Sequence, residues 1–461
     1  MSCAAILLAL SMSLSAFIVT LAILLRLLPP RACEERGERG ISAATTFTIL
    51  VPIRNEPEEV VKTFRQVIAN LDKRGLEVEV IVIDDSDKEH AQYVDRYLGD
   101  ICRIIRREKP SGFKPGALNC GLERSRGEVV VIVDSDTIVP GDFLHVISKC
   151  LGERAHYVQA PSLPLNAKTP THYAYYMYEL FRNKFLLRGT SFIGYPLISG
   201  FGYAFRRKAL VNLGGWREDL LAEDAELSVR VACEKASGRL ANLMVNDLPP
   251  ASLRDLRRQQ ERWILGSFQA LREAFREALR GKVRALIYAP LLSFYLGLLS
   301  NVLVGLVPIA AAVSGETLTV RNVVLMFVPT NILLGIFTLL LVMPATYSLG
   351  VKRTIIGAAL SGALYNALSL YAAYALLKTI LGARERWRVT GKLAPKAPPA
   401  NLMYFISTLF YFVSLALSLL YVQVLSLWLF GLALSSAICW VGEVKGTFDV
   451  PLLPASKSPR P

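Results

Sequence analysis

The 461-residue sequence has few of the residues from which disulfide frameworks and zinc sites are built. Its seven cysteines form no CxxC pair, and none of its four histidines lies four residues from another. An odd number of cysteines without such spacing argues against a disulfide framework or a structural zinc site, so we expect the soluble part in a reducing cytoplasm. Any metal must then be held by carboxylate oxygens, which favours Mg²⁺ or Mn²⁺.

Two common nucleotide-binding motifs are also absent. No GxxxxGK[ST] segment occurs, and no GxGxxG segment follows an apolar strand-like run. Without these glycine-rich loops the chain lacks the phosphate cradle of P-loop ATPases and of nicotinamide-dependent dehydrogenases. The sequence therefore excludes both classes.

The formal charge of +14 does not indicate nucleic acid binding. Basic residues gather beside apolar segments, as in the clusters at 26–39, 254–262, 282–284, 352–353 and 384–396. The positive-inside bias of membrane proteins and the attraction of anionic headgroups produce this pattern. We therefore expect membrane lipids, and no nucleic acid, among the partners.

Long apolar runs are abundant, with 52% hydrophobic residues and a mean hydropathy of +0.38. The runs occupy residues 3–28, 285–313, 323–349, 354–381 and 401–441, and each is long enough to cross a hydrocarbon core of about 30 Å. The first run lacks the charged start of a signal peptide, so we interpret residues 1–30 as a retained transmembrane helix.

The topology depends on residues 354–381. If they crossed the membrane, the basic cluster at 384–388 would face the outside, so we assign them to the interface or to a re-entrant segment. Five crossings remain, with two transmembrane helices in 284–350 and two in 401–442, because the last run is too long for one helix. This predicts a multi-pass protein of the cell membrane, with the soluble domain and the 443–461 tail in the cytoplasm.

Residues 45–250 have the composition of a soluble domain. Short β-branched runs alternate there with segments of helical periodicity, which predicts an α/β, Rossmann-like domain with a mainly parallel sheet. Four aspartates, Asp84, Asp85, Asp134 and Asp136, close two of the apolar runs. Ligands of such sheets bind at the carboxyl ends of the strands, where these side chains are expected. An acidic strand end can equally be a solvated turn or a helix cap.

Three further segments have the residue types of an anion-binding and proton-transfer site. Lys114 opens a helix whose N-terminal N–H groups suit a phosphate. Glu223 and Asp224 begin another helix, either as capping acids or with Asp224 as a general base. In the amphipathic segment 251–283, Gln259, Arg262 and Trp263 share one helical face, and they either bind a phosphate and a sugar ring or anchor the helix at the interface.

In order along the chain, these motifs resemble the cellulose synthase and hyaluronan synthase branch of the family-2 glycosyltransferases. The matching segments are VPIRNEP at 51–57, DD at 84–85, KPGALN at 114–119, DSD at 134–136, ED at 223–224, QxxRW at 259–263 and WxVTxK at 387–392. The resemblance implies a GT-A catalytic domain in 45–250, with residues 351–400 as an interfacial helix and a gating-like loop.

The resemblance also implies roles for the motif residues. The nucleotide-sugar donor is expected to contact Asp84 or Asp85, Lys114, Asp134, Asp136, Gln259, Arg262, Trp263, Thr390 and Lys392. Asp136 is the expected metal ligand, Asp224 the general base beside Glu223, and Gly200 with Trp263 the acceptor site. Ala222 stands where the family usually has Thr, and Phe201 where a small polar residue is usual, so the acceptor stays open.

The expected activity is transfer of a sugar, with inversion, from a nucleotide-diphosphate donor to a polysaccharide or lipid-linked acceptor. A single addition to a polyprenyl phosphate or another lipid is the alternative within enzymes. A nucleotide-sensing transporter or channel is the alternative outside them, but its spans should contain paired charges, and the long apolar runs contain almost none.

Overall fold

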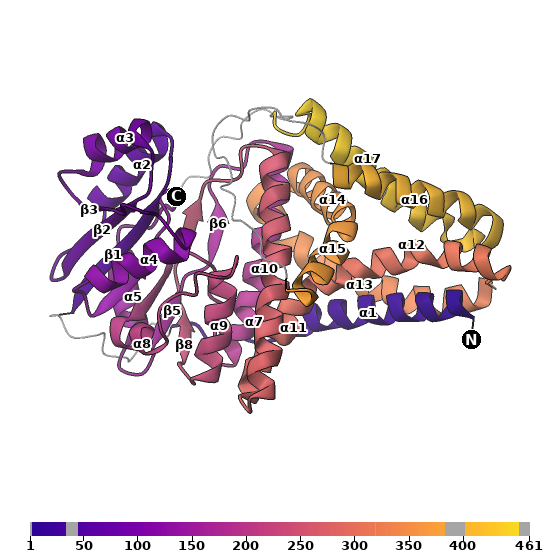
Figure 1. Ribbon diagram of the computed structural model, residues 1–461, viewed down its shortest axis with the longest axis horizontal. Coiled ribbons are helices and arrows are strands. Elements are labelled where there is room, and N and C mark those ends of the chain that lie inside the picture. Colours follow the sequence, from indigo (N-terminus) through magenta and orange to yellow (C-terminus); the bar gives the residue numbers. More distant parts are fainter. Residues whose placement is uncertain (1, 34–44, 319, 383–401, 451–461) are drawn as a thin grey trace.

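The computed structural model of the chain describes residues 2–33, 45–318, 320–382 and 402–450. An α/β domain forms one end of the molecule and an elongated bundle of helices forms the other (Figure 1). Helix α10 (Leu253–Leu279) lies between the two parts, with its axis across the direction of the bundle helices.

A seven-stranded sheet, within the described residues, forms the centre of the α/β domain, in the order β3-β2-β1-β4-β7-β5-β8. The strands are β1 (Thr46–Ile53), β2 (Glu77–Asp84), β3 (Arg103–Arg106), β4 (Val129–Ile132), β5 (Tyr157–Gln159), β7 (Tyr203–Arg206) and β8 (Gly238–Leu240). Only β7 runs antiparallel to its neighbours. Strands β6 (Ser162–Pro164) and β9 (Val245–Asp247) form a separate parallel pair. The mainly parallel sheet predicted from the sequence is thus confirmed.

Helices cover both faces of this sheet, which is why its strands are apolar on both sides. One face packs against α2 (Glu58–Ala69), α3 (Lys88–Leu98) and α5 (Phe143–Leu151), through alternate residues such as Ile49 and Val82. The other packs against α4 (Phe113–Arg124) and α9 (Glu223–Cys233), through residues such as Leu50 and Ile83. Helices α7 (Arg188–Phe192) and α8 (Arg207–Asn212) are short.

The acidic motif at 134–136 lies in a turn rather than on a strand. Strand β4 ends at Ile132, and the N–H of Thr137 donates to the carbonyl oxygen of Asp134 at 3.0 Å. The two aspartates therefore follow the strand instead of alternating along it. They still lie at the carboxyl end of β4, beside the ends of β1 and β2.

A disulfide joins Cys33 to Cys150. The N–H of Cys33 donates to the carbonyl oxygen of Leu240 at 2.9 Å, so the segment that follows α1 (Cys3–Leu27) lies beside β8, and the disulfide joins it to α5. The sequence-based expectation of no disulfide was wrong for this pair, because a single bridge 117 residues apart leaves no spacing signal. Cysteine usage therefore no longer supports the expectation that the soluble part lies in a reducing cytoplasm.

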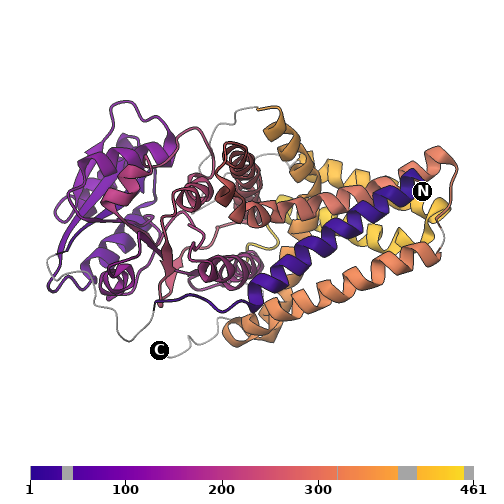
Figure 2. The ribbon, with the colours of Figure 1, turned by 90° about the horizontal axis from the view of Figure 1, so that it is seen from below.

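Five helices in the described part of the chain are long and apolar enough to cross a membrane. These spans are Cys3–Leu27, Phe294–Ser314, Val328–Leu349, Leu402–Tyr421 and Ser426–Lys445. They correspond to α1, η3 (Ser293–Leu296) with α12 (Gly297–Ser314), α13 (Val320–Leu349), α16 (Leu402–Tyr421) and α17 (Ser426–Lys445). Figure 2 shows α1 lying alongside α12 and α13.

Helices α14 (Val351–Ala367) and α15 (Ser369–Ile380) form a pair bent by 46°. By length and composition the pair is a broken span or a re-entrant segment. The bend follows Ala367, and α15 packs against α10 near the α/β domain. The assignment of this region to the interface stays a prediction.

The apolar face of α10 is largely buried. Ile264 and Phe268 pack against residues of α6 (Pro170–Phe181), α14, α15 and α16, whereas Phe275 and Leu279 at its end are exposed. Arg257 is also buried, and its Nε lies 2.8 Å from a carboxylate oxygen of Glu443 on α17. Arg257 therefore links α10 to the helical bundle, and its side chain does not extend toward solvent or lipid headgroups. Three short helices, η2 (Val283–Ile287), α11 (Ala289–Leu292) and η4 (Gln423–Leu425), connect the longer ones.

Candidate active site

A pocket of about 350 Å³ opens at the carboxyl ends of β1 and β4, between the sheet, α6, α9 and α10. Its size falls within the range of small-molecule sites. Residues predicted from the sequence line it from separate elements: Asp85, Lys114, Asp134, Asp136, Gly200, Glu223, Asp224, Gln259, Arg262 and Trp263. The fold thus brings together motifs spread over 179 positions, from Asp85 to Trp263.

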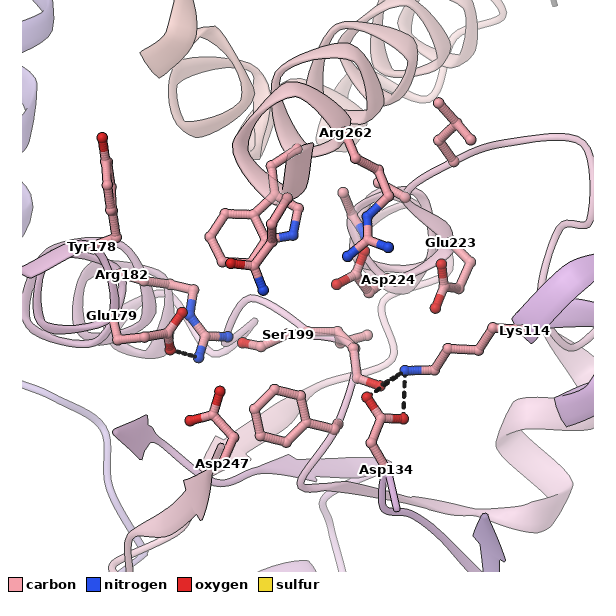
Figure 3. A pocket seen from close by; sticks show the side chains of 18 of the residues that line it. Lys114, Asp134, Tyr178, Glu179, Arg182, Ser199, Glu223, Asp224, Asp247 and Arg262 are labelled. Carbon is pink, nitrogen blue, oxygen red and sulfur yellow. Dashed lines mark hydrogen bonds and ion pairs between the residues drawn. The ribbon is translucent and has the colours of Figure 1, made fainter. Parts of the chain in front are cut away.

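Lys114 connects three parts of this pocket. From the first turn of α4, its Nζ lies 2.7 Å from Asp134 Oδ1 and donates to the carbonyl oxygen of Gly200 at 3.0 Å (Figure 3). Burial lowers the pKa of this ammonium group, but the charges of Asp134 and Glu223 outweigh burial and raise it. Lys114 is therefore a fixed positive charge at neutral pH.

Glu223 and Asp224 face the same space from the start of α9 (Figure 3). Burial and the charge of Asp224 raise the pKa of Glu223 to about 7. Burial likewise raises the pKa of Asp224, although the N–H of Ala225 and the charge of Lys114 oppose it. A carboxylate with a raised pKa in a pocket has the property that a general base needs near neutral pH.

The backbone at Gly200 passes close to this base. Gly200 has φ +79°, and a Cβ at this position would lie 3.2 Å from Asp224 Oδ2. Ser228 Oγ donates to the carbonyl oxygen of Asp224 at 2.8 Å and accepts from the N–H of Ile198 at 3.0 Å. These hydrogen bonds fix the 198–200 loop against α9, so the carboxylate and the loop form one rigid wall.

The two aspartates at the end of β2 have different surroundings. Asp84 is fully buried and pairs with Arg106, whose Nε donates to Oδ2 at 3.0 Å, and it does not line the pocket. Asp85 lines the pocket and pairs with Arg107, whose Nε donates to Oδ1 at 2.9 Å. The expectation that both open onto one crevice thus fails for Asp84, which leaves Asp85 as the candidate for the donor.

Helix α10 supplies the roof of the pocket. Burial lowers the pKa of Arg262, while Glu223 and Asp224 act to raise it, so its guanidinium faces these two acids. Gln259 Oε1 is buried and has no hydrogen-bond partner among the described residues. Trp263 is half-buried and lines the pocket beside them. This face can hold an anion and present a flat apolar surface to a ring.

Not all predicted residues can be placed. Thr390 and Lys392, with the gating-like motif at 387–392, lie outside the described residues. No group of three or more His, Cys, Asp or Glu side chains that could hold a metal occurs among the residues described. Mg²⁺ and Mn²⁺ need fewer protein ligands, because substrate phosphates and water complete their coordination. Asp136 in the pocket therefore still fits such an ion.

Sequence reasoning missed one wall of the pocket. Glu179, Arg182 and Asp247 line it opposite Lys114 (Figure 3), and Tyr175 of α6 is also part of the pocket lining. Their segments carry no motif, since α6 reads as an aromatic helix and β9 is three residues long. The only sequence signal was the charged pair three residues apart in an otherwise apolar helix.

Aromatic residues extend the pocket toward the helical bundle. They are Tyr178 and Phe181 on α6, Phe294 and Tyr295 on η3, and Tyr365 on α14. The rings of Phe181 and Phe294 lie 4.4 Å apart, and those of Phe294 and Tyr365 lie 6.1 Å apart. The pocket thus has one charged end and one apolar end, and the apolar end lies at the candidate membrane spans.

Residues 48–214, which include strands β2 to β7 and the aspartates at 84–85 and 134–136, match the profile of Glycosyl transferase family 2. The chain carries a family 2 glycosyltransferase domain. A probable glycosyltransferase from Sulfolobus acidocaldarius is 27% identical over 250 residues, 51% of this chain and 53% of that protein. A beta-monoglucosyldiacylglycerol synthase from Trichormus variabilis is 30% identical over 194 residues, 41% of each chain. The chain thus spans about half the length of these relatives.

The glycosyltransferase domain has the GT-A fold. A mannosyltransferase from Pyrobaculum calidifontis, solved with GDP-Man and Mn²⁺, superposes with a TM-score of 0.54 at 20% identity. The match covers 82% of this chain and all of that one, so it includes helices beyond the α/β domain. The narrower resemblance to the cellulose and hyaluronan synthases stays a prediction.

Proposed function

We propose that this chain is a membrane-bound, inverting glycosyltransferase that transfers a sugar from a nucleotide-diphosphate donor to a hydroxyl of a lipid acceptor. The observation that supports it most is the position of Asp224. This partly buried carboxylate lies between the side chains of Lys114 and Arg262 and a pocket wall that continues to the membrane helices. A base so placed can reach an acceptor that arrives from the bilayer.

The donor is assigned to the charged end of the pocket. Asp85 and Asp134 lie at the ends of β2 and β4, where the nucleotide of a GT-A enzyme is expected, and Gln259 and Arg262 face them from α10. A divalent ion held by Asp136 would offset negative charge on the leaving diphosphate. Lys114 supplies a fixed positive charge in the same place, because its Nζ is held by Asp134 and Gly200.

The reaction is a single displacement. The acceptor oxygen forms a bond to the anomeric carbon as the bond from that carbon to the diphosphate oxygen breaks, and Asp224 takes the acceptor proton. The N–H of Ala225 donates to Asp224 Oδ1 at 2.8 Å, and Ser228 holds the backbone of Asp224 beside Ile198, so little reorganisation is needed. The leaving diphosphate keeps the bonding electrons, and the configuration at the anomeric carbon inverts.

The aromatic end of the pocket favours a lipid over a soluble acceptor. Phe294 and Tyr365 belong to segments that form or border candidate membrane spans, and they meet Tyr178 of α6 in the pocket wall. The similarity to a synthase that by its name makes a glycolipid supports the same choice. We place the α/β domain in the cytoplasm, on the side where basic residues flank the apolar runs.

An activity screen tests this proposal. The purified chain in lipid vesicles is incubated with UDP- and GDP-sugars, Mg²⁺ or Mn²⁺, and either diacylglycerol or a polyprenyl phosphate. Incorporation of one sugar per lipid is the expected result. A ladder of longer products would favour the polysaccharide acceptor. If no combination of donor, metal and lipid gives either sugar incorporation or donor hydrolysis, the proposal is contradicted.

A further inference from the structure

Three charged side chains form the wall of the pocket that faces Lys114 and Asp224. Glu179 and Arg182, on consecutive turns of α6 and η1 (Arg182–Leu187), form a buried ion pair, and Asp247 at the end of β9 lies beside them (Figure 3). Glu179 is 1% exposed and Asp247 4% exposed. None of the three belongs to a motif used above, and the transfer step assigns them no role.

Two polar atoms of this wall lack hydrogen-bond partners. Asp247 Oδ2 accepts from the hydroxyl of Tyr175, but Oδ1 is buried and makes no hydrogen bond within the described part of the chain. The Nε of Arg182 is likewise buried and unpartnered among these residues, although its NH2 group contacts Glu179 and Ser162. Unsatisfied buried groups are rare in folded proteins, and at a pocket they indicate a missing ligand atom.

The local backbone fixes this arrangement. Helix α6 passes at Arg182 into a π-helical turn, a feature that is rare and often found at functional sites. Asn183, in the same turn, accepts from the N–H of Ser162 at 3.3 Å. The guanidinium of Arg182 lies 6.0 Å from the ring centre of Phe201. Arg182 is therefore held at the pocket by contacts on three sides.

The unpartnered pair suits a hydroxyl group. Asp247 offers an acceptor and Arg182 a donor, and a hydroxyl both donates and accepts. A phosphate does not fit, since Glu179 already neutralises Arg182 and the buried Asp247 supplies no positive charge. The wall is therefore complementary to a neutral polyol.

The position of this wall identifies which substrate it serves. Arg182 and Asp224 line the same pocket from facing walls, so a hydroxyl held by Arg182 lies in the space onto which the base opens (Figure 3). Tyr178 and Phe181, on the same helical turn, belong to the aromatic end that meets the membrane helices. The donor phosphates lie at the other end, by Lys114.

We propose that Arg182 and Asp247 bind the hydroxyls of a neutral polyol headgroup on the acceptor, such as a hexose carried by a lipid, and so select it over a lipid phosphate. This proposal rests on the proposed glycosyltransferase function. It adds two specificity residues and the chemical class of the acceptor headgroup.

The test uses the full chain in phosphatidylcholine vesicles that contain either glucosyl-dioleoylglycerol, the neutral acceptor, or undecaprenyl phosphate. Asp247→Asn and Arg182→Lys are compared with Asp142→Asn, an exposed acid outside the pocket that makes no side-chain capping hydrogen bond. For the neutral acceptor, we expect each pocket variant to raise KM about tenfold, because one hydrogen bond is lost. Donor KM and the slow hydrolysis of donor by water should change less than twofold, and Asp142→Asn should match the wild type.

Three results would overturn this subsite. They are a change in donor KM instead of acceptor KM, an unchanged acceptor KM in both folded variants, or preferential use of undecaprenyl phosphate by the wild type. Thermal unfolding of each variant identifies loss of folding, and Arg182→Lys keeps the positive charge beside Glu179. If the wild type neither hydrolyses nor transfers any donor, the proposed function fails as well. If the wild type transfers sugar and the variants do so equally well, only the proposed acceptor subsite is contradicted.

Discussion

Asp224 and Glu223 are adjacent acids in a buried first turn, and their protonation sets the pH range of transfer. Burial raises the pKa of both carboxyls, that of Glu223 to about 7. A base works only when ionised, so a raised pKa moves the loss of activity to higher pH. Because burial raises the pKa of the base Asp224, we predict that acidification lowers the transfer rate at a higher pH than the usual range of an aspartate. A pH–rate profile at saturating donor checks this, and a rate that stays constant down to pH 5 would contradict it.

Gly200 gives a second prediction at this scale. A Cβ there would lie 3.2 Å from Asp224 Oδ2, so Gly200→Ala should displace the base and lower the transfer rate about tenfold or more. Gly214→Ala is the matched control, because Gly214 has a similar φ of +84° but no atom within 4 Å of the added Cβ. Equal losses in the two variants would show that backbone strain, and not the contact with Asp224, lowers the rate.

Individual site residues could be predicted from the sequence where they belong to a recognisable motif. Lys114, Asp134 and Asp224 could be named from the sequence because each belongs to a short ordered pattern. The sequence could not distinguish Asp84 from Asp85. In the structure they differ in their partners, because Asp84 pairs with Arg106 of β3 and Asp85 pairs with Arg107 in the loop that follows. Arg182 and Asp247 carry no pattern, and only the packing of α6 against the sheet brings them to the pocket.

Helices α9 and α10 meet at a contact between two small residues. A Cβ on Gly266 would lie 2.5 Å from the Cβ of Ala222, which immediately precedes the acids of α9. Ala222, where the resembling synthases usually have Thr, is thus explained by close packing, since a larger side chain would push the helices apart. This contact sets the distance from the base to Arg262.

Gly266→Ala tests that contact. We predict destabilisation of about 1–3 kcal/mol and a loss of transfer greater than the loss of donor binding, because overpacking shifts α10 relative to α9. Thermal unfolding and donor titration measure the two effects. Gly335→Ala on α13, where the added Cβ meets no atom within 4 Å, is the control. If both variants behave like the wild type, the close approach of α9 and α10 does not depend on this contact.

Elements with strong periodicity were predicted well, and short ones were not. The βα alternation follows from short β-branched runs that separate segments of helical periodicity, and the amphipathic α10 follows from an apolar pattern of period 3.6. Strands β6 and β9 have three residues each, too few for a period to show, and their pairing depends on contacts distant in sequence. The π-helical turn at Arg182 has no composition signal at all.

The α/β domain and the helical bundle are joined by a buried ion pair. Arg257 on α10 and Glu443 on α17 are 9% and 2% exposed in their side chains. Breaking such a pair leaves one buried charge, so Arg257→Met should destabilise the chain by about 3–5 kcal/mol. We predict that Arg257→Met combined with Glu443→Leu recovers much of this loss, which denaturation of the single and double variants measures. A double variant no more stable than Arg257→Met would contradict this.

The arrangement of the whole molecule was predicted only in part from the sequence. Apolar runs located the helices, but residues 354–381 contain a bend that hydropathy cannot place inside or beside the bilayer. The disulfide was not predicted because it depends on the segment after α1 lying next to α5 in the folded chain. The side of the membrane that the α/β domain faces remains a prediction from the charge bias.

Asp224→Asn tests the central claim most directly, since it changes one atom in the proposed base. The wild type and the variant are incubated in vesicles with a radiolabelled nucleotide sugar, and label in extracted lipid is measured beside donor binding. We predict a loss of transfer of about 10²–10⁴-fold with donor affinity unchanged. Transfer by Asp224→Asn at a rate close to that of the wild type would show that this carboxylate is not the base.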